Sequence, residues 1–169
     1  MSQADMITIG FDPGLATTGY GVIRREGSGW KVMAGGVIRT PKGMPRAERL
    51  REIHQEARAL IETYDPDGVA IEEVFFATNA KTAMLTAETR GALLLAAADR
   101  AIRGYTPLQV KKRITGYGKA NKAQVQAMVK RLLCLAETPK PDDMADGLAL
   151  ALCYLLEARS VGDVEQDYL

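Results

Sequence analysis

The sequence lacks the features on which disulfide-rich, membrane-spanning and exported proteins depend. It contains only two cysteines, Cys134 and Cys153, both in apolar surroundings and without the regular spacing of a disulfide framework. No stretch approaches ~18 uncharged apolar residues, and no basic segment followed by an apolar run stands at the N-terminus. These absences predict a cytoplasmic protein with reduced thiols and with neither a membrane span nor an export signal.

Acidic residues are absent from one long part of the chain. The net charge is only +1, yet no acid occurs between Asp99 and Glu137, whereas eight acids and two basic residues follow from Glu137 onward. This distribution is typical of a surface that binds a polyanion beside a pocket that binds a cation. The alternative is an ordinary solvated helix surface, which so long a stretch without an acid disfavours. The basic residues of the stretch are Arg100, Arg103, Lys111, Lys112, Arg113, Lys119, Lys122, Lys130 and Arg131.

Hydrophobic periodicity and turn residues predict an α/β protein with about five strands in a mixed sheet flanked by helices. The 169 residues fit one domain, residues 1–159, followed by a polar C-terminal tail, residues 160–169. The first three strands follow one another closely, which favours an antiparallel meander. The expected strands are 7–11, 19–25, 30–40, 68–72 and 104–106, and the expected helices run from Pro45 to Asp65 and over 79–103, 121–135 and 141–158.

Two of the predicted strands end on a carboxylate, since IGFD closes on Asp12 and VAIE on Glu72. Ligands in α/β sheets bind beyond the carboxyl ends of the strands, so we expect both side chains at one crevice. Two neighbouring acids raise each other's pKa unless a positive charge lies between them, and Mg²⁺ or Mn²⁺ would supply it. We expect the small residues from Gly14 to Gly21 to leave room there for a backbone phosphate.

Three further acids stand at the start of the last predicted helix, in PDDMAD. Asp142 and Asp143 fall in its first turn, where acids complement the helix dipole whatever their function. Asp146 lies one turn deeper in an apolar helix, where an unpaired charge is costly. Because Asp143 and Asp146 share a face, we predict these two as metal ligands and Asp142 as a cap or outer residue. Together with the strand acids they suit a two-metal site for in-line phosphodiester hydrolysis, and the basic stretch favours a nuclease.

Five motifs resemble, in order and spacing, those of the RuvC-type Holliday junction resolvases of bacteria. They are FDPGLATTGYGVI, AIEEVFFATNA, QVK, GKANKAQVQAMV and DDMADGLALA, and the similarity covers about residues 7–156. The resemblance implies a ribonuclease H-like fold and a homodimer that cuts two opposing strands of a four-way DNA junction symmetrically with Mg²⁺. It also implies roles in homologous recombination and DNA repair, with RuvA and RuvB as branch-migration partners.

The same resemblance assigns the family's catalytic acids to Asp12, Glu72, Asp143 and Asp146. The chain departs from the expected pattern at Glu73, which doubles the strand acid, and at Asp142. Because side chains alternate along a strand, we expect Glu73 to face away from Glu72. Other ligand types occupy the third acid position in some family members, so Asp143 is the least constrained of the four.

The resemblance also assigns DNA contacts. An aromatic residue near the crossover falls on Phe75, for which core packing is an equal alternative, with Phe76 as the other candidate for stacking. Junction-contacting lysines fall on Lys111 and Lys122. Asn79 is a further DNA-contact candidate, and its alternative role is to cap the helix that follows.

A basic segment around Gly116–Gly118 supplies the remaining DNA-contact candidates, Lys112, Arg113 and Lys119. We expect this segment to be mobile and to follow phosphates, with helix surface as the alternative for Lys112 and Lys119. The only histidine, His54, is expected beside the apolar stripe of the first helix, at the boundary between core and surface, and not in a catalytic role.

Other functions fit parts of the pattern. Actin-like and sugar-kinase-like ATPases also begin with a strand, an aspartate and a glycine, but this chain is short for their two domains and lacks a P-loop. Another ribonuclease H-like nuclease is the nearest alternative, and a non-catalytic junction-binding protein would not need the four acids. The two-fold symmetry of a junction favours a dimer, for which the apolar helix after Asn79 is a candidate interface.

Overall fold

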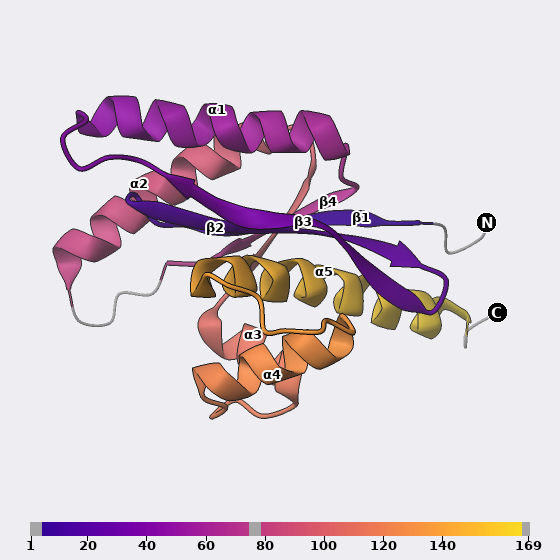
Figure 1. The fold of residues 1–169 in the computed structure, drawn as a ribbon. Helices are drawn as coiled ribbons and strands as arrows, with labels where there is room; N and C mark the ends of the chain where they lie inside the picture. The colour runs from indigo at the N-terminus through magenta and orange to yellow at the C-terminus, as the bar shows by residue number, and fades with distance from the viewer. Residues whose placement is uncertain (1–4, 75–78, 167–169) are drawn as a thin grey trace.

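The chain folds into a five-stranded sheet between two layers of helices, as a computed structural model of residues 5–74 and 79–166 shows (Figure 1). The predicted α/β class with a mixed sheet is confirmed. The elements are β1 (Ile7–Asp12), β2 (Thr17–Glu26), β3 (Gly29–Arg39), α1 (Arg46–Tyr64), β4 (Gly68–Glu72), α2 (Ala80–Ala96), β5 (Ala101–Tyr105), α3 (Pro107–Thr115), α4 (Lys122–Leu132) and α5 (Asp142–Gln166).

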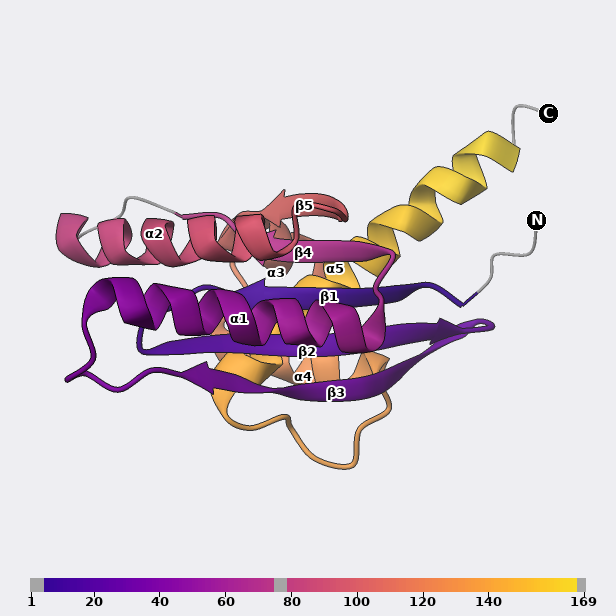
Figure 2. The same cartoon turned by 90° about the horizontal axis from the view of Figure 1, so that it is seen from above.

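The strands are arranged in the order β3-β2-β1-β4-β5. β1, β2 and β3 form the predicted antiparallel meander, and β4 and β5 continue the sheet parallel to β1. Helices α1 and α2 cover one face of the sheet, and α3, α4 and α5 lie on the other (Figures 1 and 2). Because side chains alternate along β1, Ile9 and Phe11 are buried in the core beneath α1 and α2, whereas Gly10 and Asp12 face α5.

Helix α5 lies directly on β1 and β2 because glycines remove the side chains between them. A β-carbon at Gly10 would overlap the backbone of α5 at Gly147, and one at Gly19 would overlap the carbonyl oxygen of Asp143. Gly19 was expected to leave room for a phosphate. Its observed role is to let the start of α5 approach the end of β1, which brings the acids of both elements together.

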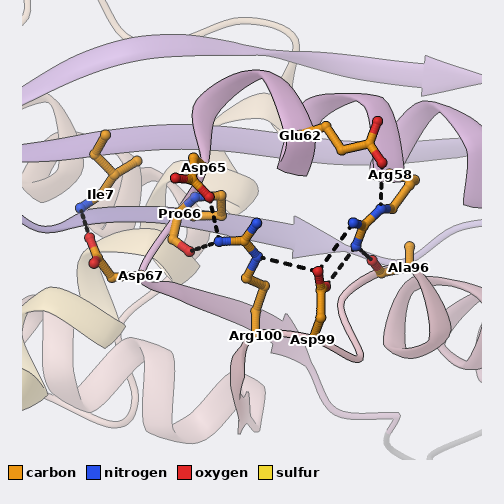
Figure 3. Close-up of polar contacts among 9 residues, drawn as sticks. All are labelled: Ile7, Arg58, Glu62, Asp65, Pro66, Asp67, Ala96, Asp99 and Arg100. Carbon is orange, nitrogen blue, oxygen red and sulfur yellow. Dashed lines mark hydrogen bonds and ion pairs between the residues drawn. The ribbon is translucent and has the colours of Figure 1, made fainter.

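The amino-terminal edge of β4 and β5 is closed by arginine–carboxylate contacts (Figure 3). Arg58 of α1 donates to both carboxylate oxygens of Asp99, at 2.6 and 3.1 Å, and to the carbonyl oxygen of Ala96 at the end of α2. Arg100 donates to Asp65 at 2.6 Å and to the carbonyl oxygen of Pro66. These contacts tie the connections before β4 and β5 to α1.

The structure corrects two of the expected boundaries at the connection between α2 and β5 and adds a helix that was not predicted. The helix predicted over 79–103 ends at Ala96, and β5 starts at Ala101 in place of Gly104, because Arg58 binds the last carbonyl of α2 and the chain then turns into the sheet. The basic segment after Thr106 contains a helix, α3, whose capping box at Thr106 and Gln109 with Pro107 in the first turn was a readable signal.

The last helix continues beyond the expected Ala158 to Gln166, and its end projects from the body of the molecule (Figure 2). Within residues 5–74 and 79–166, none of the helices has the length and apolar composition that crossing a membrane requires.

Candidate functional site

Four of the predicted acids meet at the carboxyl edge of the sheet. Asp12 ends β1, and Glu72 ends the neighbouring parallel strand β4, with Phe11 paired to Ile71 just before them. Carboxylate oxygens of Asp12, Asp143 and Asp146 all lie within 4.8 Å of one another. The carboxyl of Glu72 shares a hydrogen bond with that of Asp12, so it belongs to the same cluster.

Burial and the charges of neighbouring acids disfavour the ionised forms of Asp12, Glu72 and Asp146. The pKa of Asp12 is raised from 3.8 to about 8, chiefly by burial and then by the negative charges of Glu72 and Asp146. Burial also raises the pKa of Glu72 and of Asp146. Neighbouring negative charges act in the expected direction at Asp12 and Asp146, whereas the contact with Asp12 lowers the pKa of Glu72.

One cation reaches this cluster from outside. The Lys122 ammonium, at the start of α4, lies 3.5 Å from Asp146 and 3.3 Å from Asp142. Burial opposes the charged form of Lys122, but Asp146 and Asp142 outweigh it and raise the pKa of the ammonium. Gln126, one turn along α4, donates to Asp142 at 3.1 Å. Asp142 is thus linked to the cluster through Lys122, which contacts both Asp142 and Asp146. This position agrees with the outer place predicted for Asp142.

The second strand acid, Glu73, lies on the opposite side of the sheet from Glu72, as predicted. Its carboxylate is packed beside Gly104 of β5, next to the guanidinium of Arg90 from α2. Arg90 also donates through Nε to the carbonyl oxygen of Glu72 at 3.1 Å. That bond fixes the backbone at the end of β4, where the Glu72 side chain leaves the strand.

The donor set suits a hard divalent cation. Every donor in the cluster is a carboxylate oxygen, which is the ligand type that Mg²⁺ and Mn²⁺ prefer. Asp12, Glu72 and Asp146 have raised pKa values, so a cation bound between the acids would relieve both the repulsion and the burial penalty. A divalent metal site is the chemistry that this geometry supports.

The other predicted contact residues are distributed around this site. Asn79 caps α2, since its side chain accepts a hydrogen bond from the backbone N–H of Thr82 at 3.3 Å, and this confirms the capping alternative. Phe75 lies outside the described residues, as does Phe76. Lys111, Lys112 and Arg113 stand on α3, where Arg113 lies 4.0 Å from Glu157, and Lys119 lies in the loop that follows.

Three contributors escaped the sequence analysis. Arg90 and Gln126 give no signal in the sequence, because a single polar residue in a helix does not reveal which distant backbone or carboxylate it contacts. Gly10 and Gly19 were visible in the sequence, but their steric role depends on which helix packs over β1 and β2. The helix predicted over 121–135 is observed as α4, with a capping box at Asn121 and Gln124, but the sequence did not show that this helix places Lys122 beside the acids of α5.

Comparisons with known proteins agree with this arrangement. The model of one protein family, crossover junction endodeoxyribonuclease RuvC, matches residues 8–154. A crossover junction endodeoxyribonuclease RuvC from Alkaliphilus oremlandii is 53% identical over 151 residues, which are 88% of this chain and 92% of that protein.

Two solved structures of RuvC from Thermus thermophilus are similar throughout. The structure of the protein alone shares 36% sequence identity with this chain at a TM-score of 0.86. The structure of its complex with a Holliday junction substrate shares 35% sequence identity at a TM-score of 0.87. Both matches cover 92% of this chain and 96% of the other chain. The likeness confirms the ribonuclease H-like fold that the sequence predicts.

Proposed function

This chain belongs to the family of crossover junction endodeoxyribonucleases RuvC, and from that premise we propose that it resolves four-way (Holliday) DNA junctions by symmetric paired nicks. The observation that carries the proposal is the cluster of Asp12, Asp143 and Asp146 carboxylates at the end of the central strand. A protein that only bound junctions would not need half-buried acids whose charged forms are disfavoured by burial and by one another. The biological setting would be homologous recombination and DNA repair.

We assign the metal-binding and catalytic roles to Asp12, Glu72, Asp143 and Asp146. They would hold two Mg²⁺ ions, with Mn²⁺ as a possible substitute. When bound, such a pair would activate the attacking water and stabilise the leaving oxygen of a phosphodiester. The carboxyls of Asp12 and Glu72 must be ionised to act as ligands, so metal binding would release protons from them.

The rest of the site positions these four groups. Arg90 holds the backbone of Glu72, and the close contact of Gly19 with α5 holds Asp143 over β2. Lys122 offers an ammonium beside Asp146, where it would contact a phosphate oxygen next to the cut. We keep Phe75, Asn79, Lys111, Lys112, Arg113 and Lys119 as further proposed DNA contacts.

A homodimer is proposed from the exposed face of α2. The residues on this face are apolar or small, and its two largest members, Met84 and Leu95, are 61% and 68% exposed and lie three helical turns apart. A second copy related by a two-fold axis would bury this face and place two sites on two junction strands of like polarity. The exposed residues of the face are Ala80, Met84, Ala87, Gly91 and Leu95.

The wider setting follows from the family. We propose the RuvA–RuvB branch-migration complex as a partner and the cytoplasm as the location, since the substrate is chromosomal DNA. We also propose that residues 1–159 form a single nuclease domain and that residues 160–169 are a polar C-terminal tail.

One assay tests the proposed activity against its alternatives. The purified protein is incubated with a synthetic immobile four-way junction, a linear duplex of matched sequence and an RNA–DNA hybrid, with and without Mg²⁺. Paired, ligatable nicks in the junction alone are the expected result. Equal cutting of the hybrid would indicate a general ribonuclease H-like nuclease, and binding without cutting at any metal concentration would indicate a non-catalytic junction-binding protein.

A further inference from the structure

The loop between α3 and α4 carries an exposed aromatic ring that the proposed function leaves without a role. Tyr117 is 56% exposed, and Leu108 of α3, whose side chain lies against Gly118, is 51% exposed. Exposed apolar side chains are common singly. These two, however, stand together in the stretch between Asp99 and Glu137 that contains nine basic residues and no acid.

Backbone and hydroxyl contacts hold this loop in one conformation. The Thr115 hydroxyl donates to the carbonyl oxygen of Lys111 at 2.7 Å and accepts from the N–H of Tyr117 at 3.1 Å. The N–H of Ala120 donates to the carbonyl oxygen of Tyr117 at 3.1 Å. Gly116 supplies the left-handed turn, with φ of 75°. The segment that was expected to be mobile therefore has a bonded turn that presents the Tyr117 ring outward.

The loop leads directly to the carboxylate cluster. Lys122 follows Tyr117 by five residues, and its ammonium lies 3.5 Å from Asp146. Five extended residues span at most about 17 Å, so the ring lies within a few nucleotides of a phosphate held at the cluster. A DNA strand that enters the site on this side would pass between the ring and the neighbouring lysines, Lys112 and Lys119.

We propose that Tyr117 is a stacking contact for junction DNA, in which its ring packs against a base exposed near the crossover while Lys112 and Lys119 bind adjacent phosphates. The inference rests on the proposed function and adds a residue to its DNA surface. Continuity with the cleavage site and the absence of acids favour DNA over a protein partner. A rigid backbone favours stacking, because little conformational freedom is lost when the base arrives.

The test measures equilibrium binding in EDTA, where cleavage is suppressed. Wild type, Tyr117→Ala, Tyr117→Phe and Lys119→Ala are titrated against a fluorescent four-way junction and a linear duplex of the same sequence, each at several salt concentrations. Tyr117→Ala should weaken junction binding by about 5- to 150-fold, the range for loss of one base–aromatic stack, with little effect on the duplex. Tyr117→Phe should bind as wild type does.

The salt dependence separates stacking from charge. Tyr117→Ala should leave the slope of log K against log salt unchanged, whereas Lys119→Ala should reduce it by about 0.9 and weaken both DNAs. Three results would overturn the stacking inference and leave the proposed function intact. They are junction binding by Tyr117→Ala at wild-type strength, an equal loss of affinity in Tyr117→Phe, and a change of slope in Tyr117→Ala that matches that of Lys119→Ala. A wild-type protein without preference for the junction would overturn the proposed function as well.

Discussion

The two ends of the parallel strands both gather acids but leave them in opposite electrostatic states. At the amino-terminal edge, Asp99 and Asp65 are paired with Arg58 and Arg100 at 2.6 Å (Figure 3), and Arg58 holds the pKa of Asp99 below its usual range. At the carboxyl edge, burial and neighbouring acids raise the pKa of Asp12 to about 8. The arginine-paired acids belong to the connections between elements, whereas the acids at the carboxyl edge are those that we propose as metal ligands.

A second contrast lies along α5 itself. Asp146, near its start, has a raised pKa, and its carboxylate lies 3.5 Å from the Lys122 ammonium and within 4.8 Å of carboxylate oxygens of Asp12 and Asp143. Glu157, eleven residues later, accepts a hydrogen bond from the Tyr105 hydroxyl at 2.6 Å and lies 3.3 Å from Arg103. Burial would raise the pKa of Glu157, but these partners outweigh it and lower the pKa. One helix thus carries both kinds of acid. The position of Asp146 in an apolar helix distinguished it in the sequence, whereas the partners of Glu157 come from β5 and could not be predicted from α5 alone.

The largest expected effect comes from neutralising one acid at the carboxyl edge. Asp146→Asn should reduce junction cleavage by about 10³-fold or more, because a divalent ion contributes several kcal/mol to stabilisation of the transition state. Junction affinity in EDTA should remain close to that of wild type. Single-turnover cleavage and a binding titration measure the two quantities.

The matched control for this substitution is Asp99→Asn at the arginine-paired edge. It should leave the cleavage rate within about two-fold of wild type, since it lies outside the site. Loss of junction binding in Asp146→Asn, or an equal loss of cleavage in both variants, would count against the metal assignment.

A second prediction concerns stability. Asp12→Asn removes a buried acid that ionises at a cost, so without metal the variant should be more stable than wild type at pH 8 by about 1–3 kcal/mol. Thermal unfolding in EDTA measures the change, and cleavage should be abolished in the same variant. A lower melting temperature at pH 8 would show that the Asp12 carboxylate already has a stabilising partner in the chain.

The pH dependence of the wild-type protein follows from the same carboxyl. Folding raises the pKa of Asp12 from 3.8 to about 8, so the folded state keeps a proton there that the unfolded chain loses. The contribution of Asp12 to stability is therefore fully present below about pH 4 and is lost as the pH rises toward about 8. Added Mg²⁺ should raise the melting temperature most at the upper end of this range, since it binds the ionised carboxyls. A shift by Mg²⁺ that is independent of pH would contradict the expectation.

The smallest expected effect is at the amino-terminal edge. Arg58→Met removes the guanidinium that binds Asp99 and the last carbonyl of α2, so it should lower the melting temperature by a few degrees without changing the cleavage rate. Thermal unfolding at low and high salt measures it, with Arg51→Met, an exposed arginine earlier on α1, as the matched control. An equal decrease in the control would show that the contacts of Arg58 contribute nothing of their own.

Much of the site was predictable because its residues stand at the ends of elements. The carboxylates that close IGFD and VAIE, and the spacing of Asp143 and Asp146 on one helix, depend only on local periodicity. The end of α2 was predicted wrongly because the residues from Ala97 to Arg103 remain compatible with a helix, and the contact that ends it comes from Arg58 in another element. The contacts of Lys122 with two acids of α5 also required the packing of α4 against that helix.

The sequence by itself determined the α/β class, the identity of the four acids and the acid-free basic stretch, because each depends on residue type and on spacing within one element. Only the tertiary structure decided how closely the carboxylates approach one another and which protonation state burial favours. The approach of α5 to β1 and β2 depends on glycines facing each other across separate elements, and the raised pKa of Asp12 depends on the burial that this approach creates. Distance and desolvation are properties of packed elements, and no single segment of the chain contains them.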